Sequence, residues 1–285
     1  MFEYRKISAG EVLCAYLYEK VVDTNIWSRL EDRHFHTTAR PKEFRRFFQE
    51  AIALNLTRRL ILAAEFVRLN QCPEPTETHF IGLLDKPICK LGLMEKNQRG
   101  QISRLLKDAL ICSRHSISTR LRQGMLNWSR GHHNFCYLCG KELNFNLTQN
   151  ENDSDITLDH LWPQAYGGDS IEENILPACR DCNSRKKRDY ASWAGCNVHT
   201  LMVGVDPSEG AIMSIGLQFQ YALYNRAATA YANRKKISLK ESYITLGPWK
   251  SEICVLDADD VGDFFNLSNY NTEENEYGTE LLQMS

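Results

Sequence analysis

The chain lacks any long apolar run, although 43% of its 285 residues are hydrophobic. No apolar stretch approaches the roughly 18 residues of a membrane-spanning helix, so we expect no membrane span. Residues 1–30 lack the apolar core and the cleavage site of a secretory signal peptide. We therefore expect a cytoplasmic protein with reduced thiols, because disulfides need an oxidising compartment.

Basic residues are missing from one end of the chain. Residues 251–285 contain nine Asp or Glu and no Lys or Arg. The whole chain has a formal charge of −2, so without these nine negative charges residues 1–250 carry +7. A positive surface of this kind suits contacts with phosphate groups. The acidic segment is typical either of a solubilising end or of a competitor that occupies a basic surface.

Two Cys-x-x-Cys pairs lie in the middle of the chain, Cys136 with Cys139 and Cys179 with Cys182. A gap of two residues lets both sulfurs of one pair face the same ion, and zinc prefers four such ligands. Gly140 can supply the positive φ that such a turn often needs. The two pairs together predict a structural zinc. The alternatives are a pair of disulfides or four buried thiols.

Strand-like segments and polar residues lie between the two pairs. Residues 156–158 are β-branched and apolar, which predicts a short strand that ends at Asp159 and His160. A loop containing Pro163 and two glycines should follow. Residues 174–176 predict a second short strand that is ended by Pro177.

A helix is predicted from Asp181 onward. On this helix Asn183, Lys186, Lys187 and Tyr190 share one face, because they follow i, i+3, i+4 and i+7 spacing. The order strand, loop, strand, helix therefore brings polar groups of the first strand toward polar groups of the helix.

This segment resembles the HNH endonuclease family in its zinc-knuckle form, which has a ββα-metal fold. The matching positions are Cys136, Cys139, Asp159, His160, Gly167, Gly168, Asn174, Cys179, Cys182, Asn183 and Lys186. The resemblance is confined to residues 136–188, and we assign the rest of the chain to no family. The last letter of the family name corresponds to Asn183 instead of His, a common variant that changes the expected metal.

The resemblance implies metal-dependent hydrolysis of DNA phosphodiester bonds. Asp159 and Asn183 offer oxygen ligands, which suit Mg²⁺ or Mn²⁺ as a Lewis acid. His160 should lie on the other face of the strand and act as the general base, with an ordinary pKa of about 6.5. By resemblance, Asn174 braces the loop with side-chain hydrogen bonds. Lys186 is expected to contact a phosphate oxygen.

Each of these residues also has a plainer interpretation. Asn174 could be a turn residue, Asn183 could satisfy backbone amides at a helix start, and Lys186 could lie on a solvated helix face. The competing function is a non-catalytic zinc-ribbon module that binds nucleic acid or a partner protein. The set of Asp159, His160 and Asn183 argues against it, because binding alone does not require these three residues.

The flanking regions have mostly helical patterns. A capping box at Ser8 and Glu11 predicts one helix start, and Pro41 should open a long helix to about Asn70. Another helix should run from Asp206 to about Lys236. A helical stripe of core residues is formed by Ile102, Leu105, Leu106, Ala109 and Leu110.

We therefore expect a mainly α protein with a small α+β insert, in which helical flanks surround a central, zinc-stabilised ββα-metal HNH module. The expected domains are an N-terminal helical region (1–130), the nuclease module (131–196) and a C-terminal helical region with the acidic tail (197–285). DNA is the expected partner, together with a companion protein that supplies targeting or regulation. Among the settings of this family, bacterial anti-phage defence or restriction is favoured.

Overall fold

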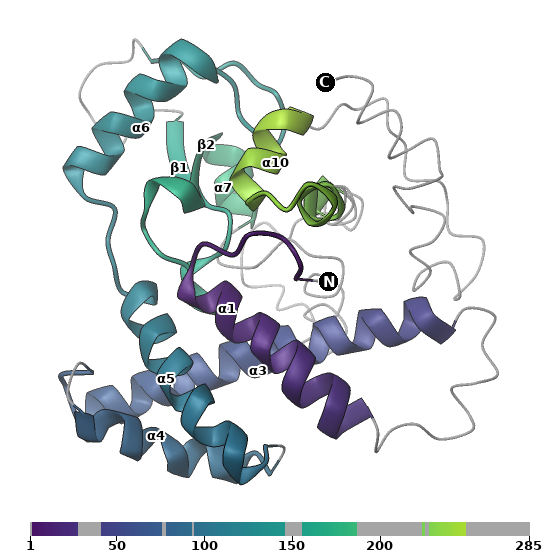
Figure 1. Ribbon diagram of the computed structural model, residues 1–285. Helices are drawn as coiled ribbons and strands as arrows, with labels where there is room; N and C mark the ends of the chain where they lie inside the picture. The colour runs from purple at the N-terminus through teal and green to yellow at the C-terminus, as the bar shows by residue number, and fades with distance from the viewer. Residues whose placement is uncertain are drawn as a thin grey trace, which may run out of the picture. The chain divides into compact units, whose positions relative to one another are not determined.

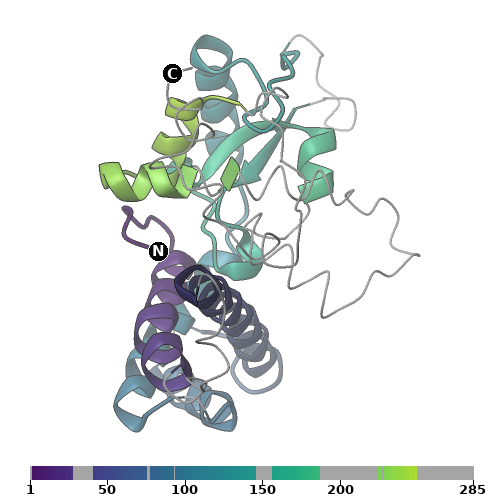
Figure 2. The same cartoon turned by 90° about the vertical axis from the view of Figure 1, so that its right-hand side faces the viewer.

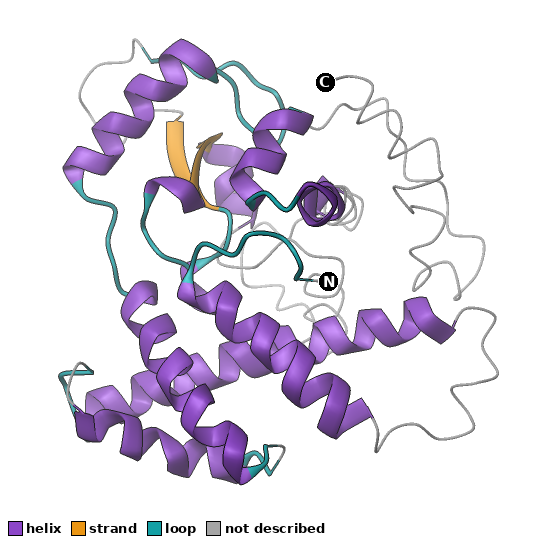
Figure 3. Ribbon diagram, in the orientation of Figure 1, coloured by secondary structure: helices purple, strands orange, loops and turns teal. Residues whose placement is uncertain are grey.

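The computed structural model describes residues 2–27, 41–75, 78–92, 94–145, 156–186, 224–225 and 228–248, without the side chains of 23–27, 41–47 and 185. These residues are mostly helical, and they include a two-stranded antiparallel sheet (Figures 1 and 3). The mainly α class with a small β element is thus confirmed. Among the described residues, no helix is both long and apolar enough to cross a membrane.

The chain divides into two compact units. The first, called here the sheet unit, comprises Met1–Arg5, Ser116–Leu161 and Ser170–Ser285. The second, called the helical unit, comprises Lys6–His115 and Trp162–Asp169. The domain boundaries expected near residues 130 and 196 remain predictions, and the second of them lies outside the described residues.

The helical unit consists of helices that pack side by side in both views (Figures 1 and 2). Its elements are α1 (Ala9–Tyr16), a π-helical continuation η1 (Leu17–Trp27), α3 (Pro41–Asn70), α4 (Thr78–Lys90) and α5 (Lys96–Ser113). The Glu11 carboxylate accepts the Ser8 backbone N–H at 2.8 Å, so the predicted cap forms. The apolar stripe of α5 is buried at Ile102, Leu106, Ala109 and Leu110, as expected for core residues.

A tight loop completes the helical unit. It contains the 3₁₀ turn η3 (Gln164–Tyr166), and the buried Trp162 donates its indole N–H to the Tyr166 carbonyl at 2.8 Å. The Gly10 backbone N–H of α1 donates to the Gly167 carbonyl at 3.0 Å. A Cβ atom at Gly10 would lie only 1.9 Å from the Tyr166 carbonyl oxygen. Glycine is therefore required where α1 meets this loop.

The sheet unit holds the two predicted strands and the predicted helix that follows them. Its elements are α6 (Thr119–His132), β1 (Ile156–His160), the 3₁₀ turn η4 (Glu172–Asn174), β2 (Ile175–Cys179), α7 (Arg180–Lys186) and α10 (Leu239–Leu246). On one face of the sheet Leu158 and Ile175 pack against Met125 of α6. On the other face α7 contacts both strands. The sheet is thus enclosed between two helices.

The second strand is longer than expected. It starts at Ile175 and continues through Pro177 to Cys179, so the prediction that Pro177 ends it was wrong. Pro177 lies opposite Leu158, and its carbonyl accepts the Tyr137 backbone N–H at 3.4 Å, on the side away from β1. Because the missing N–H of proline is not needed between the strands there, the residue is tolerated.

Several expectations fall outside the described residues. They are the continuation of α7 past Lys186 with Lys187 and Tyr190, the helix start at Asp206, and the acidic segment 251–285. Residues 228–235 are helical, in agreement with a helix that ends near Lys236. The separate helix α10 was not predicted.

The close contact at Gly10 gives a test of the helical unit. Gly10→Ala should lower the melting temperature, because overpacking against backbone atoms costs about 1–3 kcal/mol or more. Gly82→Ala is the matched control, since a Cβ atom there meets nothing within 4 Å inside α4. The control should be neutral or stabilising by about 0.5–1 kcal/mol. Equal melting temperatures of the Gly10 variant and the unchanged protein would contradict the packing described.

Candidate active site

The four cysteines of the two pairs come together. Their sulfur atoms all lie within 4.8 Å of one another, and the Cys139 and Cys179 sulfurs are 3.8 Å apart. A tetrahedral zinc with Zn–S bonds of about 2.3 Å separates its sulfur ligands by about 3.8 Å. All four residues are free thiols in this structure: Cys136, Cys139, Cys179 and Cys182. The cluster thus fits zinc, and no disulfide joins its members.

The local backbone explains how the first pair folds. Gly140 has a φ of +73°, as the sequence predicted, and its N–H donates to the Cys136 carbonyl at 2.9 Å. Hydrogen bonding between the two side chains lowers the pKa of the Cys139 thiol and raises that of Cys136.

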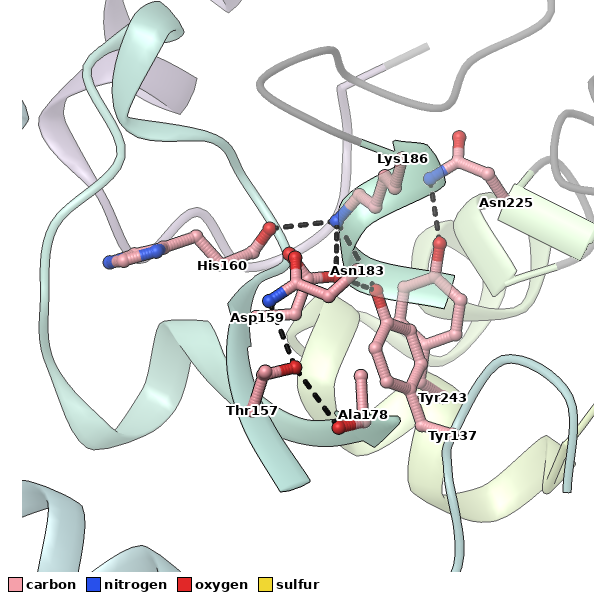
Figure 4. Close-up of polar contacts among 9 residues, drawn as sticks. All are labelled: Tyr137, Thr157, Asp159, His160, Ala178, Asn183, Lys186, Asn225 and Tyr243. Atoms are coloured by element: carbon pink, nitrogen blue, oxygen red, sulfur yellow. Dashed lines mark hydrogen bonds and ion pairs between the residues drawn. The ribbon is translucent and has the colours of Figure 1, made fainter. Parts of the chain in front are cut away.

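The carboxylate of Asp159 is buried on the face of the sheet that α7 covers, and it forms an ion pair with the Lys186 ammonium. Its Oδ2 atom accepts hydrogen bonds from the Lys186 ammonium at 2.7 Å and from the Tyr137 hydroxyl at 2.5 Å (Figure 4). The Lys186 ammonium also donates to the His160 carbonyl at 2.8 Å. Burial raises the pKa of Tyr137 well above its ordinary value, so the phenol keeps the proton that it donates.

Asn183 lies one turn before Lys186 on α7, and both side chains extend toward β1 (Figure 4). The Thr157 hydroxyl donates its proton to the Ala178 carbonyl at 3.0 Å. It can therefore only accept from Asn183, whose Nδ2 lies 3.0 Å away. This chain of hydrogen bonds turns the Nδ2 end toward Thr157 and leaves the Oδ1 end as the one that can face a metal ion.

His160 leaves β1 on the side opposite to Asp159, as the alternation of a strand requires. Figure 4 shows its imidazole pointing away from Lys186, while its backbone carbonyl faces the ammonium. The Nε2 atom lies 2.9 Å from the Ser170 hydroxyl. His160 as a whole is partly buried.

Asn174 and Lys186, the other two predicted site residues, are both buried but make different contacts. Asn174 is buried, and its backbone carbonyl accepts the Leu161 N–H at 2.9 Å, which closes the loop between the strands. Its predicted side-chain role remains a prediction. Lys186 is 5% exposed, so it does not lie on a solvated helix face. Its predicted phosphate contact would require it to leave Asp159.

Sequence reasoning missed three residues that position this site. Tyr137 lies inside the first Cys-x-x-Cys pair, where the cysteines dominate the pattern. Thr157 was counted only as a β-branched strand residue, although it orients Asn183. Ser170 contacts His160 but has no distinctive spacing. Alternation along β1 could have found Thr157, which shares a face with Asp159.

A two-stranded antiparallel sheet with a short helix, next to a four-cysteine cluster, defines a ββα module. Residues 136–195 match the profile of a family described as HNH endonuclease, which confirms the resemblance seen in the sequence. The match includes all four cysteines and spans β1, β2 and α7. It suggests nuclease activity for this module. No curated protein and no solved structure matches the chain.

The cysteine cluster predicts that zinc and folding of the sheet unit are coupled. Cys139→Ser should lower the zinc content by one equivalent per chain and shift the thermal transition of the unit downward. Metal content by mass spectrometry and thermal circular dichroism provide the measurements. Cys72→Ser serves as a control, because Cys72 is buried in the helical unit, away from any cysteine pair. A zinc content equal to that of the unchanged protein in Cys139→Ser would refute this site.

Proposed function

We propose that this protein is a metal-dependent endonuclease that hydrolyses DNA phosphodiester bonds. The observation that supports it best is the arrangement of Asp159, His160 and Asn183 at β1 and α7, inside the segment that matches the HNH endonuclease family. A site used only for binding has no need of a buried carboxylate, an imidazole on the opposite face and an oriented carboxamide.

Asp159 and Asn183 are the residues that would hold a Mg²⁺ or Mn²⁺ ion. Carboxylate and carboxamide oxygens are the hard ligands that such ions prefer. When bound, the ion supplies Lewis-acid stabilisation of the phosphate and of the departing 3′-oxygen. The Thr157 hydroxyl contributes by keeping the Asn183 carboxamide in one orientation.

His160 is the proposed general base. Its imidazole would remove a proton from the attacking water. The Ser170 hydroxyl, at 2.9 Å from Nε2, restrains rotation of the ring. A base that is held in one orientation spends less time in unproductive geometries.

Lys186 has two successive roles in this proposal. Its ammonium neutralises Asp159 before a metal binds, at a distance of 2.7 Å. Two cations repel each other at one carboxylate, so a divalent ion held by Asp159 would weaken the hold of this carboxylate on the Lys186 ammonium. The released side chain can then contact a phosphate oxygen, which is the role expected from the sequence. Lys186 thus exchanges one anionic partner for another.

We further propose that a companion protein supplies targeting, and that the setting is bacterial anti-phage defence or restriction. Support for the companion protein comes from α3 in the helical unit, where Leu62, Phe66 and Leu69 are 61%, 62% and 63% exposed. Their i, i+4 and i+7 spacing puts them on one side of the helix. Large exposed apolar groups of this kind are typical of protein docking surfaces.

The proposed base gives a direct test. His160→Ala should reduce Mg²⁺-dependent nicking of a supercoiled plasmid by about 10²–10⁴-fold, the usual contribution of a general base. DNA binding, measured by fluorescence anisotropy in EDTA, should remain close to that of the unchanged protein. His132→Ala is the matched control, since His132 is an exposed histidine at the end of α6 in the same unit. Undiminished nicking by His160→Ala would exclude this role.

The proposed exchange of Lys186 predicts that Lys186→Met needs less Mg²⁺ but reacts more slowly. In Lys186→Met the Mg²⁺ concentration for half-maximal nicking should fall, because no ammonium competes for Asp159. The rate at saturating Mg²⁺ should fall by roughly 10–100-fold, since a charge-assisted contact of about 1.5–3 kcal/mol is lost.

Lys141→Met controls for the loss of one positive charge, because Lys141 is exposed next to the first cysteine pair. A purely structural ion pair predicts a different result for Lys186→Met. The protein would then be destabilised by about 3–5 kcal/mol, and Mg²⁺ would restore neither its stability nor its activity.

A further inference from the structure

A second group of metal-ligating side chains lies in the helical unit, separate from the residues of the proposed nuclease centre. The group consists of Cys112, His115 and Asp169, whose potential ligand atoms all lie within 4.8 Å of one another. Cys112 belongs to the last turn of α5, His115 follows that helix, and Asp169 ends the loop after Trp162. Neither the sequence pattern nor the family resemblance indicated this group.

The three side chains are held together through the carboxylate. The Oδ1 atom of Asp169 lies 2.8 Å from Nδ1 of His115, and the same carboxylate hydrogen-bonds with the Cys112 thiol. The backbone N–H of Ala9, the first residue of α1, hydrogen-bonds with the sulfur from another direction. Cys112 and Asp169 are partly buried, whereas the His115 side chain is 53% exposed. The thiol and the carboxylate are thus partly shielded from solvent, and the cluster is accessible to solvent at His115.

The backbone around the cluster is fixed on both sides. The Gln164 side chain donates to the His115 carbonyl at 2.6 Å, so the loop that carries Asp169 also holds the residue that carries the imidazole. The same loop is anchored to α1 by the hydrogen bond from Gly10 to Gly167 at 3.0 Å. The ligand-bearing segments are therefore pre-positioned before any ion binds, which lowers the ordering cost of binding.

We propose that Cys112, His115 and Asp169 form a second metal site that binds Zn²⁺. One thiolate, one imidazole and one carboxylate are a donor set suited to zinc, whereas Mg²⁺ and Ca²⁺ prefer oxygen ligands only. With three protein ligands, the fourth tetrahedral position is left for a water molecule on the exposed side. Ligand distances below 4.8 Å require only small side-chain rotations to reach the spacing of a zinc shell.

A thiol nucleophile is the main alternative role for Cys112. A nucleophilic thiol is activated by a base such as an imidazole that is hydrogen-bonded directly to it. Here the Asp169 carboxylate contacts both the thiol and the imidazole, which suits three ligands around one ion better.

Zinc at this position would join segments that are distant in the sequence. Cys112 and His115 lie at the end of α5, and Asp169 lies beyond β1. A bound ion acts as a cross-link between them, and cross-links that close long loops restrict the unfolded chain most. Ligand binding to the folded state alone also raises the melting temperature. We therefore expect zinc to stabilise the helical unit.

The test measures zinc content in full-length protein after dialysis against zinc and removal of the free ion. Cys112→Ser, His115→Ala and Asp169→Asn should each hold one zinc equivalent less than the unchanged protein. Cys89→Ser is the matched control, because Cys89 is also a free thiol of the helical unit with a carboxylate neighbour, Asp85 at 3.4 Å. This control should keep the full zinc content.

A second measurement distinguishes this site from the four-cysteine cluster. In a Cys139→Ser background, His115→Ala should remove a further zinc equivalent, and with it the visible absorption of bound Co²⁺ that this site contributes. His115 is half-exposed, so its replacement is compatible with an intact fold, which circular dichroism checks. A zinc content unaffected by His115→Ala and Asp169→Asn would overturn the proposal. Because no DNA is used, this result is independent of nuclease activity.

Discussion

A carboxylate buried below a two-stranded sheet needs a counter-charge, and this requirement organises the sheet unit. Asp159 is 4% exposed and Lys186 is 5% exposed, so the two charges meet out of contact with water. Desolvation offsets much of the attraction in such a pair, so its net contribution to stability is small. Loss of one partner is nevertheless costly, because the other would be left unpaired. The pair therefore fixes where α7 lies on β1 more than it stabilises the fold.

This fixed position of α7 has consequences for its neighbours. With Lys186 bound to Asp159, Asn183 one turn earlier reaches Thr157. The Tyr137 hydroxyl completes the same cluster and connects it to the turn between Cys136 and Cys139. One ion pair thus aligns the helix, the strand and the cysteine turn.

Residues 224–225 and helix α10, which follow the module in the sequence, pack against it. The Tyr137 ring packs edge-on against Tyr243 of α10, with ring centroids 5.3 Å apart, and Asn225 donates to the Tyr243 hydroxyl at 2.8 Å. Lys240 lies over the Trp128 ring and donates to the Glu172 carbonyl at 2.6 Å. Residues well beyond the sequence motif therefore keep Tyr137, and through it Asp159, in position.

Patterns with short spacing were predictable, and contacts between distant segments were not. The cysteine pairs, the strand that ends at His160 and the long helix from Pro41 to Asn70 follow from local spacing and from β-branched, proline and apolar residues. The sequence also indicated which residues lie on α7 and β1. It could not indicate that Lys186 binds Asp159. A lysine at that spacing is equally compatible with an ion pair to Asp159 and with a contact to a phosphate oxygen.

Most of the missed features depend on tertiary packing. The start of helix α10 was overlooked, although Ser238 and Glu241 form a capping box like the one at Ser8 and Glu11. The cluster in the helical unit joins residues 112, 115 and 169, whose separation fits no compact motif. The role of Pro177 was misjudged because the sequence does not show which edge of a strand faces its partner.

Pro177 also limits how the module can associate with other chains. The outer edge of a β-strand ordinarily attracts further strands through its free N–H and C=O groups. At Pro177 this edge has no N–H, and its carbonyl is occupied by the Tyr137 backbone. A third strand cannot add there in register. Self-association by edge-to-edge pairing is blocked at the middle of β2, so any partner must recognise this edge through side chains.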